Sequence, residues 1–562
     1  MNRIKDSLDP LGILSSFLKV QKLWIEKPGD LIDILEESGS DVLSGLAGEI
    51  GAALFNGNGS KEEWSDPRNG LLRLVKGYAK ISHHLHAACG KWLREYVNRA
   101  EGLDEGEKKR ALFGVNQVIN ALSPANCFWT NPLAVEKLVR TNGASLISGL
   151  KNLLEDFERG DHLISIADPE AFKPGESIAT TPGHVIFRNE LMELIQYTPA
   201  TETVHAVPVV FIQAWLSKYY IVDLNEEMSM VRYLVSRGFT VLITSWKNPG
   251  PDMSDVRFED YMIRGALKAV EVAREVCGVE QVHAVGYCVG GTVLASLMAW
   301  LNRAPSQDPP ARDHPSPIKD WTLLAAMVDL SERGDLEVFI SESAVGMLEG
   351  LMERDGYLDS NYMTFGVRLL RSDVMIWHYH VHNYLMGEPP PKSEFLYWSA
   401  DATRLPAATG AFLLRDLCLN NNLAKKDVVV LDGRPIDMGC ITEPLYAVGA
   451  EQDHICPWKG TFKICNLVSG PVRYTLALEG HVTGFVNPPS PRNKKKYYTG
   501  DAAGESGPDE WLSGRRVRRG SWWPDWAEWL SERCGPRVAP PPVGSARYPR
   551  LEKAPGSYVM ER

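Results

Sequence analysis

The chain has 562 residues, of which 60 are Lys or Arg and 71 are Asp or Glu, so its formal net charge is −11. Hydrophobic residues make up 44% and charged residues 23%, which is ordinary globular composition and excludes a wholly disordered, collagenous or coiled-coil chain. The acidic balance argues against a general nucleic-acid binder. No apolar run is long enough to cross a bilayer and no signal peptide is apparent. Nine cysteines without CxxC or HExxH motifs suit neither a disulfide scaffold nor a zinc site, so we expect a cytoplasmic protein without a metal.

Residues 1–178 carry the pattern of a helical domain. Within this part, Leu71–Arg99 and Pro132–Arg159 have apolar residues at three- and four-residue intervals, the spacing of one helix face. Asn131-Pro132 and Thr141-Asn142-Gly143 are turn signals that punctuate these segments. We therefore expect an N-terminal domain of helices joined by short turns.

From about Thr181 the pattern changes to short β-rich runs separated by helical segments. The clearest runs are Val207–Ile212, Thr240–Ser245, Val282–Val285, Trp321–Met327, Pro444–Val448 and Val472–Leu478. Strands that alternate with helices indicate a mostly parallel sheet with helices on both faces. The sequence thus predicts an α/β core in two parts, residues 179–329 and residues 431–562.

Between the two parts of the core, residues 330–430 interrupt the alternation. A connection of about a hundred residues is far longer than an ordinary link between strand and helix. Much of it has a helical pattern, so we expect an inserted cap. Two further segments are expected at the surface: Ala304–Pro317, rich in Pro, Asp and Ser, and the Pro-rich tail from about Gly535.

The strongest chemical signal lies at Val282–Gly291, where a β-branched strand runs into Gly286-Tyr287-Cys288-Val289-Gly290 and a helical pattern follows. This turn has the form of the nucleophile elbow of α/β-hydrolases, with Cys in place of Ser. Small residues on both sides of Cys288 let strand and helix approach closely, and a helix N-terminus favours a thiolate. The alternative is a glycine-rich turn that holds a buried cysteine by chance.

An elbow nucleophile requires an acid and then a histidine further along the chain, each after a strand. Asp453 follows the run Pro444–Val448, and His481 follows the run Val472–Leu478. We expect His481 to deprotonate Cys288 and Asp453 to orient the imidazole. Asp329, one strand earlier, is a competing acid. His454 is a second candidate base, although its place in the chain is wrong for that role.

The oxyanion formed during such a reaction needs backbone N–H donors. The topology of the fold assigns them to Val289 and to the loop after Val207–Ile212, near Leu216. Basic clusters at Arg492–Lys496 and Arg515–Arg519 are typical of a solvated face. Because the first cluster follows His481, contact with the phosphates of an acyl carrier is a second hypothesis.

Motifs spread over nearly the whole chain resemble those of the polyhydroxyalkanoate synthases, which polymerise (R)-3-hydroxyacyl-CoA into storage polyester. Besides the elbow, the matching segments are Ser123-Pro124, Thr130–Pro132, Ala179–Gly183, Phe187–Tyr197, Lys218–Leu224, Ser245–Pro249, Asn383–Gly387, Leu396–Trp398, Asp453–Trp458, Gly480-His481, Asn487–Pro489 and Ala554–Val559. The long N-terminal region resembles that of the one-subunit synthases, and the chain looks like class I.

The resemblance implies that Cys288 carries the growing chain, that His481 and Asp453 complete a triad, and that the acid helps to activate the 3-hydroxyl of the incoming monomer. It implies no cofactor, since CoA is the leaving group of the substrate. It also implies a homodimer at the surface of cytoplasmic polymer granules, with a mobile cap over the nucleophile.

Three places depart from the family pattern. Gln213–Ser217 replaces a Pro-Pro-x-Ile-Asn run, Gly410 replaces a His, and Glu479 stands where Ser is usual. Glu479 adds a carboxylate that would raise the pKa of His481. Two other functions remain open: a thioesterase or intracellular polyester depolymerase of the same fold, and a catalytically silent granule-associated protein.

Overall fold

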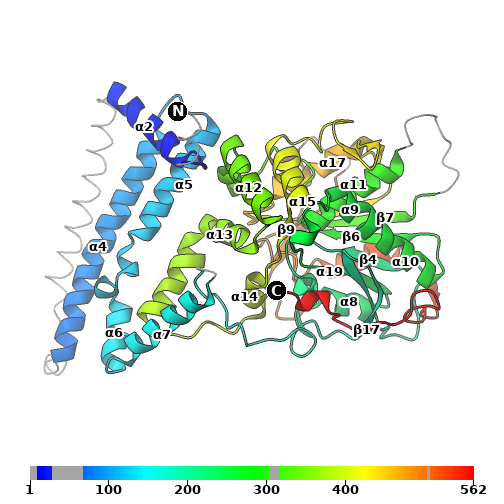
Figure 1. Ribbon diagram of the computed structural model, residues 1–562, viewed down its shortest axis with the longest axis horizontal. Helices are drawn as coiled ribbons and strands as arrows, with labels where there is room; N and C mark the ends of the chain where they lie inside the picture. The colour runs from blue at the N-terminus through cyan, green and yellow to red at the C-terminus, as the bar shows by residue number, and fades with distance from the viewer. Residues whose placement is uncertain (1–8, 28–66, 161–162, 304–314, 503–506) are drawn as a thin grey trace. The chain divides into compact units, whose positions relative to one another are not determined.

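The computed structural model describes residues 9–27, 67–160, 163–303, 315–502 and 507–562. Two compact units divide the chain (Figure 1). The first consists of Met1–Asp168, Glu337–Met347 and Asn361–Ser393, and the second of Pro169–Leu336, Leu348–Ser360 and Glu394–Arg562. Several parts of the sequence predictions lie outside the described residues: 1–8, 28–66 and 161–162 of the helical domain, 304–314 of the surface excursion and 503–506 of the second part of the core.

The first unit is helical, as the sequence predicts. Its elements are α2 (Ile13–Glu26), α4 (Pro67–Asn98), α5 (Glu105–Ala121), η2 (Pro124–Asn126), η3 (Phe128–Thr130), α6 (Pro132–Arg140), α7 (Ala144–Arg159), most of α13 (Ser360–Leu370), and the π-helical segments η8 (Asp373–Trp377) and η9 (His380–Leu385). The predicted turn at Asn131 begins α6, because its side chain accepts hydrogen bonds from the N–H groups of Leu133 and Ala134. The turn at Thr141–Gly143 separates α6 from α7.

The helices α2, α4 and α5 share a small apolar core. Its buried members are Val20, Trp24, Val97, Ala100, Ala111, Val115 and Ile119. The ring of Trp24 stacks on that of Tyr96 at 5.4 Å, and its Nε1 donates a 2.8 Å hydrogen bond to the Tyr96 carbonyl. Asp104 and Glu107 form a reciprocal capping box at the start of α5.

The second unit is built on a sheet of eleven strands among the described residues, in the order β15-β14-β13-β12-β7-β6-β4-β5-β2-β1-β17. Its centre is parallel, with neighbours β5 (Val241–Trp246), β4 (Val209–Ile212), β6 (Val282–Tyr287), β7 (Ile318–Leu324), β12 (Leu445–Ala450) and β13 (Val472–Ala477). These are the strands expected from the β-rich runs, so the prediction of a mostly parallel α/β sheet is confirmed.

Helices cover both faces of this sheet. The helix α19 (Trp523–Ser531) packs on one face, where Trp526 contacts Phe211 of β4 and Trp529 contacts His283 of β6. On β6, Gly286 lies an odd number of residues from His283 and so points to the opposite face. That face carries α11 (Val289–Asn302), because the nearest atoms to Gly286 belong to its first turn.

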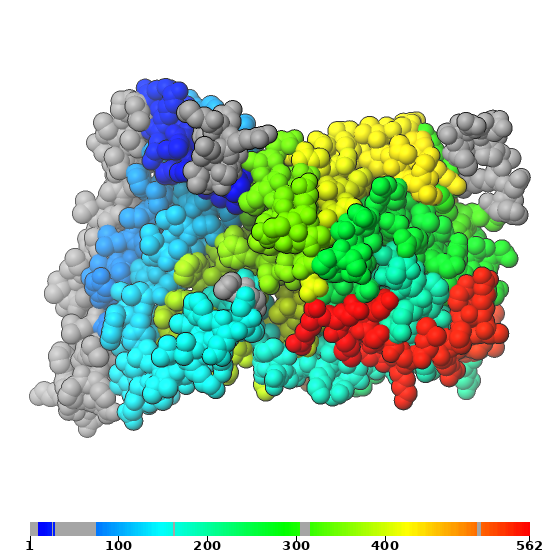
Figure 2. Space-filling view, in the orientation of Figure 1, coloured from blue at the N-terminus to red at the C-terminus, as the bar shows by residue number. Residues whose placement is uncertain are grey.

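Antiparallel strands extend the sheet at both edges: β1 (Gly183–Arg188), β2 (Met192–Tyr197) and β17 (Glu552–Lys553) on one side, β14 (Lys496–Asp501) and β15 (Arg518–Arg519) on the other. The C-terminal tail lies on the surface of this unit (Figure 2). It contributes β17, which pairs with β1, and β16 (Arg537–Val538), which pairs with β3 (Val204–His205).

The remaining elements connect the strands of the second unit, follow the last strand (η12) or belong to the predicted cap. Those outside the cap are η4 (Tyr219–Val222), α8 (Met230–Ser236), η5 (Pro251–Met253), α9 (Phe258–Asp260), η6 (Tyr261–Leu267), α10 (Lys268–Cys277), η11 (Met438–Cys440), α16 (Trp458–Phe462), α17 (Ile464–Leu467), α18 (Pro508–Ser513) and η12 (Tyr558–Met560).

The segment predicted as one cap, residues 330–430, divides between the two units. It is mainly helical and includes η7 (Gly334–Phe339), α12 (Glu342–Asp355), α14 (Glu394–Ala400), α15 (Ala407–Ala411) and η10 (Phe412–Leu419). Its short strands are β8 (Tyr357–Leu358) and β9 (Leu405–Pro406); β10 (Val430–Leu431) begins at its last residue, and β11 (Arg434–Pro435) follows it. Within the described ranges, no helix combines the length and apolar character of a membrane span.

Candidate active site

Cys288 occupies the turn between β6 and α11, with φ 50° and ψ −126°. A positive φ is uncommon for a residue with a side chain, and it is the backbone geometry that an elbow nucleophile requires. The N–H of Cys288 donates to the carbonyl of Leu324 at 2.8 Å, and its own carbonyl accepts from the N–H of Gly291 at 2.8 Å. The strained turn is thus held by β7 on one side and by α11 on the other.

The glycines around Cys288 are required by close packing. A Cβ on Gly286 would lie 2.4 Å from the Cα of Gly291, and one on Gly290 would lie 2.4 Å from the carbonyl oxygen of Ile212. Both neighbours are backbone atoms that cannot move aside alone. The predicted reason for small residues at these two positions is therefore confirmed.

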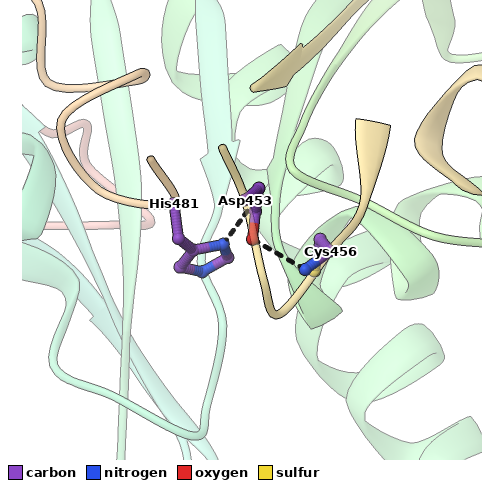
Figure 3. Close-up of side chains that lie close together, drawn as sticks. All are labelled: Asp453, Cys456 and His481. Carbon is purple, nitrogen blue, oxygen red and sulfur yellow. Dashed lines mark hydrogen bonds and ion pairs between the residues drawn. The ribbon is translucent and has the colours of Figure 1, made fainter. Parts of the chain in front are cut away.

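Asp453 and His481 follow neighbouring parallel strands, β12 and β13, and meet at the same edge of the sheet. The Nδ1 of His481 lies 2.7 Å from Oδ2 of Asp453. The other carboxylate oxygen, Oδ1, accepts a hydrogen bond from the backbone N–H of Ile455 at 2.9 Å. It accepts a second from the backbone N–H of Cys456 at 2.8 Å (Figure 3). The two backbone hydrogen bonds fix the buried Asp453 carboxylate, and the carboxylate in turn holds the His481 imidazole in one orientation.

The competing acid Asp329 and the second candidate base His454 do not take part in the Asp453–His481 pair. Asp329 uses its carboxylate to accept hydrogen bonds from Ser331 at 2.8 Å and from Asn421 at 2.9 Å. The carboxylate bonded to His481 is that of Asp453. His454 adjoins Asp453 in the chain but is not the histidine that this carboxylate binds.

The charges in the site favour a thiolate on Cys288. A hydrogen-bonding interaction with the Cys456 thiol has the largest effect, and it outweighs burial. Together with hydrogen bonds to His481 and the Val289 N–H, and the charge of His481, it lowers the pKa of Cys288 to about 5. Burial acts to lower the pKa of His481, but the charge of Asp453, its hydrogen bond and Cys288 raise it to about 10. The arrangement therefore favours a thiolate–imidazolium pair at neutral pH.

Cys456 is a member of this site that the sequence analysis does not single out. It is 5% exposed, and the pKa of its thiol is raised, first by the interaction with Cys288 and then by burial. The directions of the two pKa shifts therefore assign the proton to Cys456 and the negative charge to Cys288. The only signal in the sequence is its position three residues after the acid, in Asp453-His-Ile-Cys456.

Asp453, Cys456 and His481 each offer a possible metal-ligand atom, and the three atoms lie within 4.8 Å of one another. Both oxygens of Asp453, however, already accept hydrogen bonds, one from the imidazole and one from two backbone groups. An acid that orients a histidine accounts for the same geometry.

The loop predicted to supply the second oxyanion donor lies against the elbow. The atoms nearest to Gly290 are the carbonyl groups of Ile212 and Gln213, ahead of Leu216 in the chain. The Gln213 N–H donates to Thr244 Oγ1 at 3.0 Å. Trp215 is buried and its ring stacks on that of Tyr261 at 4.5 Å, which anchors the altered sequence Gln213–Ser217.

The other two departures from the family pattern also have local explanations. A Cβ on Gly410 would lie 2.4 Å from the sulfur of Met352, so a larger side chain there requires the Met352 side chain to move. Burial lowers the pKa of Lys495, and the charge of Glu479 opposes that shift. The raised pKa of His481 has its main causes in Asp453 and Cys288.

The parallel sheet, with an elbow between β6 and α11, defines the chain as a protein of the α/β-hydrolase fold. A family model described as the N-terminus of poly-beta-hydroxybutyrate polymerase matches residues 76–234. Among solved structures, a monoacylglycerol lipase of Paleococcus ferrophilus is 12% identical, with a TM-score of 0.32 over 61% of this chain and 98% of that chain.

Curated relatives cover most of the chain. The poly(3-hydroxyalkanoate) polymerase of Methylorubrum extorquens is 39% identical over 84% of this chain and 76% of its own length. The corresponding polymerase subunit of Cupriavidus necator is 37% identical over 84% and 78%, and polymerase 2 of Ectopseudomonas oleovorans is 33% identical over 92% and 91%. The chain belongs to the poly(3-hydroxyalkanoate) polymerase family, a family of acyltransferases.

The packing at Gly290 predicts that Gly290→Ala damages the elbow. The added Cβ would meet a backbone oxygen at 2.4 Å, so strand β4 or helix α11 has to shift, and we expect a loss of about 1–3 kcal/mol of stability from overpacking. Thermal unfolding and the rate of Cys288 alkylation measure the effect. Gly346→Ala is the matched control, because no atom lies within 4 Å of a Cβ at that helical position. Equal melting temperatures for the two variants would contradict the prediction.

The thiolate on Cys288 predicts an unusual pH dependence of alkylation. Because the pKa is lowered to about 5, the rate with iodoacetamide should stay nearly constant from about pH 8 to about pH 6 and fall only below that, whereas an ordinary thiol loses about tenfold per unit below about 8.5. Peptide mass analysis after timed quenching measures the rate, with glutathione as reference. A Cys288 rate that follows the glutathione curve would show that the site does not stabilise the thiolate.

Proposed function

We propose that this chain polymerises (R)-3-hydroxyacyl-CoA into polyhydroxyalkanoate, releasing CoA, through an acyl intermediate on Cys288. The observation that carries the proposal is the cysteine on the elbow paired with a histidine that a buried Asp453 orients. The substrate class is supported by relatives named poly(3-hydroxyalkanoate) polymerases.

In the first step, the Cys288 thiolate attacks the carbonyl carbon of the acyl-CoA thioester. The bond from that carbon to the CoA sulfur breaks, and the departing thiolate takes a proton from the His481 imidazolium. The transient oxyanion is stabilised by the Val289 N–H and by a second N–H from the loop that contains Leu216. One thioester replaces another, so the acyl-enzyme keeps the energy needed to form an ester.

In the second step, the 3-hydroxyl oxygen of another hydroxyacyl unit attacks the carbonyl carbon of the acyl group. The new ester C–O bond forms, the bond from that carbon to the Cys288 sulfur breaks, and Cys288 leaves as a thiolate. His481, neutral after the first step, is the base that takes the hydroxyl proton. Both Asp453 oxygens are engaged, one by the His481 ring and one by backbone N–H groups. This geometry favours Asp453 acting through His481 over direct removal of the hydroxyl proton.

Polymerisation rather than hydrolysis requires that the hydroxyl reach the acyl group in preference to water. We assign that task to the predicted cap, residues 330–430. The family resemblance is also the basis for proposing a cytoplasmic homodimer at the surface of polymer granules. A thioesterase or depolymerase would use the same three side chains, so the product distinguishes these functions.

Variants of the three side chains test the mechanism. Cys288→Ala should abolish CoA release from 3-hydroxybutyryl-CoA, and His481→Gln and Asp453→Asn should each lower kcat by about 10³–10⁴-fold, because proton transfer or its orientation is lost. CoA is measured by chromatography. Asp329→Asn is the control carboxylate and should retain most of the activity, since its partners are Ser331 and Asn421. CoA release by Cys288→Ala at the wild-type rate would overturn the covalent mechanism.

A product assay tests the polymerase activity itself. With 3-hydroxybutyryl-CoA, CoA release should be matched by insoluble polyester that is weighed and then hydrolysed to 3-hydroxybutyrate for quantification. Free 3-hydroxybutyrate in solution, equal to the CoA released and without polymer, would identify a hydrolase instead. No CoA release from short- or medium-chain substrates would favour the silent granule-associated protein.

A further inference from the structure

Two histidines lie side by side on a helical segment of the first unit. His378 lies just before η9 and His382 within it, and their ring centres are 4.3 Å apart with an angle of 36° between the ring planes. Both reach the surface, since His378 is exposed and the side chain of His382 is 37% exposed. Two imidazoles at positions i and i+4 of a helix are an arrangement with which proteins bind zinc.

A carboxylate fixes the ring of His382. Its Nδ1 lies 2.6 Å from Oε2 of Glu388, and the other oxygen of Glu388 accepts a 2.6 Å hydrogen bond from Nζ of Lys137. Burial acts to raise the pKa of Glu388, but the hydrogen bonds and charges of Lys137 and His382 lower it. An ionised carboxylate only accepts hydrogen bonds. The neutral His382 ring therefore carries its proton on Nδ1 and has its lone pair on Nε2.

This contact between an imidazole and a carboxylate is typical of a metal ligand. A histidine that binds a metal almost always donates its other ring N–H to a carboxylate, a carbonyl or water, which fixes the tautomer and the orientation of the ring. The backbone holds the same pair together, because the N–H of Glu388 donates to the carbonyl of His382 at 2.9 Å. The ring of His382 is thus oriented before any ion binds.

His378 offers the second imidazole. Its ring contacts those of Tyr379 and His382, and within the described part of the chain neither of its ring nitrogens has a hydrogen bond. His380, between the two on the same segment, differs, because its Nε2 lies 3.1 Å from the carbonyl oxygen of Asn126. The pair with nitrogens available to an ion is therefore His378 and His382.

The spacing of the two rings fits a shared ion. A zinc–nitrogen bond is about 2.1 Å long, so two nitrogens on one ion lie at most about 4.2 Å apart. With ring centres 4.3 Å apart, rotation of the exposed His378 ring brings one of its nitrogens within that range of Nε2 of His382. We propose that His378 and His382 bind one divalent transition-metal ion, with Glu388 orienting His382.

The chemistry of the donors selects the class of ion. Imidazole nitrogens favour zinc, copper and nickel, whereas magnesium and calcium prefer oxygen ligands. Two protein ligands leave the remaining coordination positions to water. A search for HExxH misses this pair, because no Glu follows His378 and the supporting carboxylate comes six residues after His382. The site is independent of the proposed function of Cys288, so each can fail without the other.

Calorimetry on the full-length chain tests the site. Zinc chloride is titrated into the wild type and into His378→Ala, His382→Ala and Glu388→Ala, after circular dichroism has verified that each is folded. Each variant should bind zinc at this site about tenfold more weakly or worse, because a ligand or the group that orients it is lost. His378→Ala keeps the test decisive if Glu388→Ala unfolds, since His378 is exposed. His380→Ala is the matched control and should bind as the wild type does.

Cobalt absorption separates this site from the cluster of Asp453, Cys456 and His481, which contains a thiol. Cobalt bound to cysteine has an intense near-ultraviolet band from sulfur-to-metal charge transfer, and cobalt bound to nitrogen and oxygen lacks it. We expect the wild type to bind an equivalent of cobalt without that band, and His378→Ala to lose it.

Three results would overturn the proposal. The first is equal zinc affinity in the wild type, His378→Ala and His382→Ala. The second is a loss in His380→Ala as large as theirs, which would indicate a general effect of removing a histidine. The third is a sulfur band on all the cobalt that the wild type binds, which would assign the ion to a thiol.

Discussion

The close approach of α11 to the ends of β6 and β4 is the constraint on which the candidate site depends. At Gly286 and Gly290 a single added carbon would lie 2.4 Å from backbone atoms, so helix and strands are already in contact there. That contact forces Cys288 into a positive φ and lifts its side chain out of the sheet at the N-terminus of α11. Asp453 and His481 lie near this turn because they follow β12 and β13, which belong to the same parallel sheet and end at the same edge as β6.

Hydrogen bonds at this edge of the sheet stabilise a charged pair that burial alone would oppose. In water, a thiol and an imidazole favour the neutral pair over the charged pair by about a hundredfold, because the ordinary pKa of Cys is about 8.5 and that of His about 6.5. Here Asp453 stabilises a proton on His481, and Cys456 and the Val289 N–H stabilise negative charge on Cys288, while burial opposes both charges. The charged pair persists because hydrogen bonds replace the lost water on each side. The carboxylate needs its own support for the same reason, and two backbone N–H groups of the following loop supply it.

Sequence patterns predicted those parts of the fold that depend on neighbouring residues. The central parallel strands are short, mostly apolar runs, and Asn131 and Gly143 mark helix ends by their own chemistry. The strand β2 was not among the clear runs, because Glu193 and Gln196 make it polar although it is fully buried. Arg188 is a local partner of Glu193, but both side chains also have partners in the C-terminal tail: Ser557 donates to Glu193, and Gly544 donates to Gln196. No local pattern contains such a pairing. The choice of Asp453 over Asp329, and the presence of Cys456, likewise depend on contacts between distant segments.

The loop after β12 supports both charges of the site. The backbone N–H of Cys456 donates to the Asp453 carboxylate, which orients His481 and keeps a proton on its ring. The thiol of the same residue has the largest part in lowering the pKa of Cys288. The residue three positions after the acid therefore contributes to the acid through its backbone and to the nucleophile through its side chain. A serine at position 456 would keep the backbone hydrogen bond and a polar side chain, whereas a valine would keep only the backbone hydrogen bond. This double contribution is a physical reason for a polarisable thiol at a buried position where packing alone requires only a small apolar side chain.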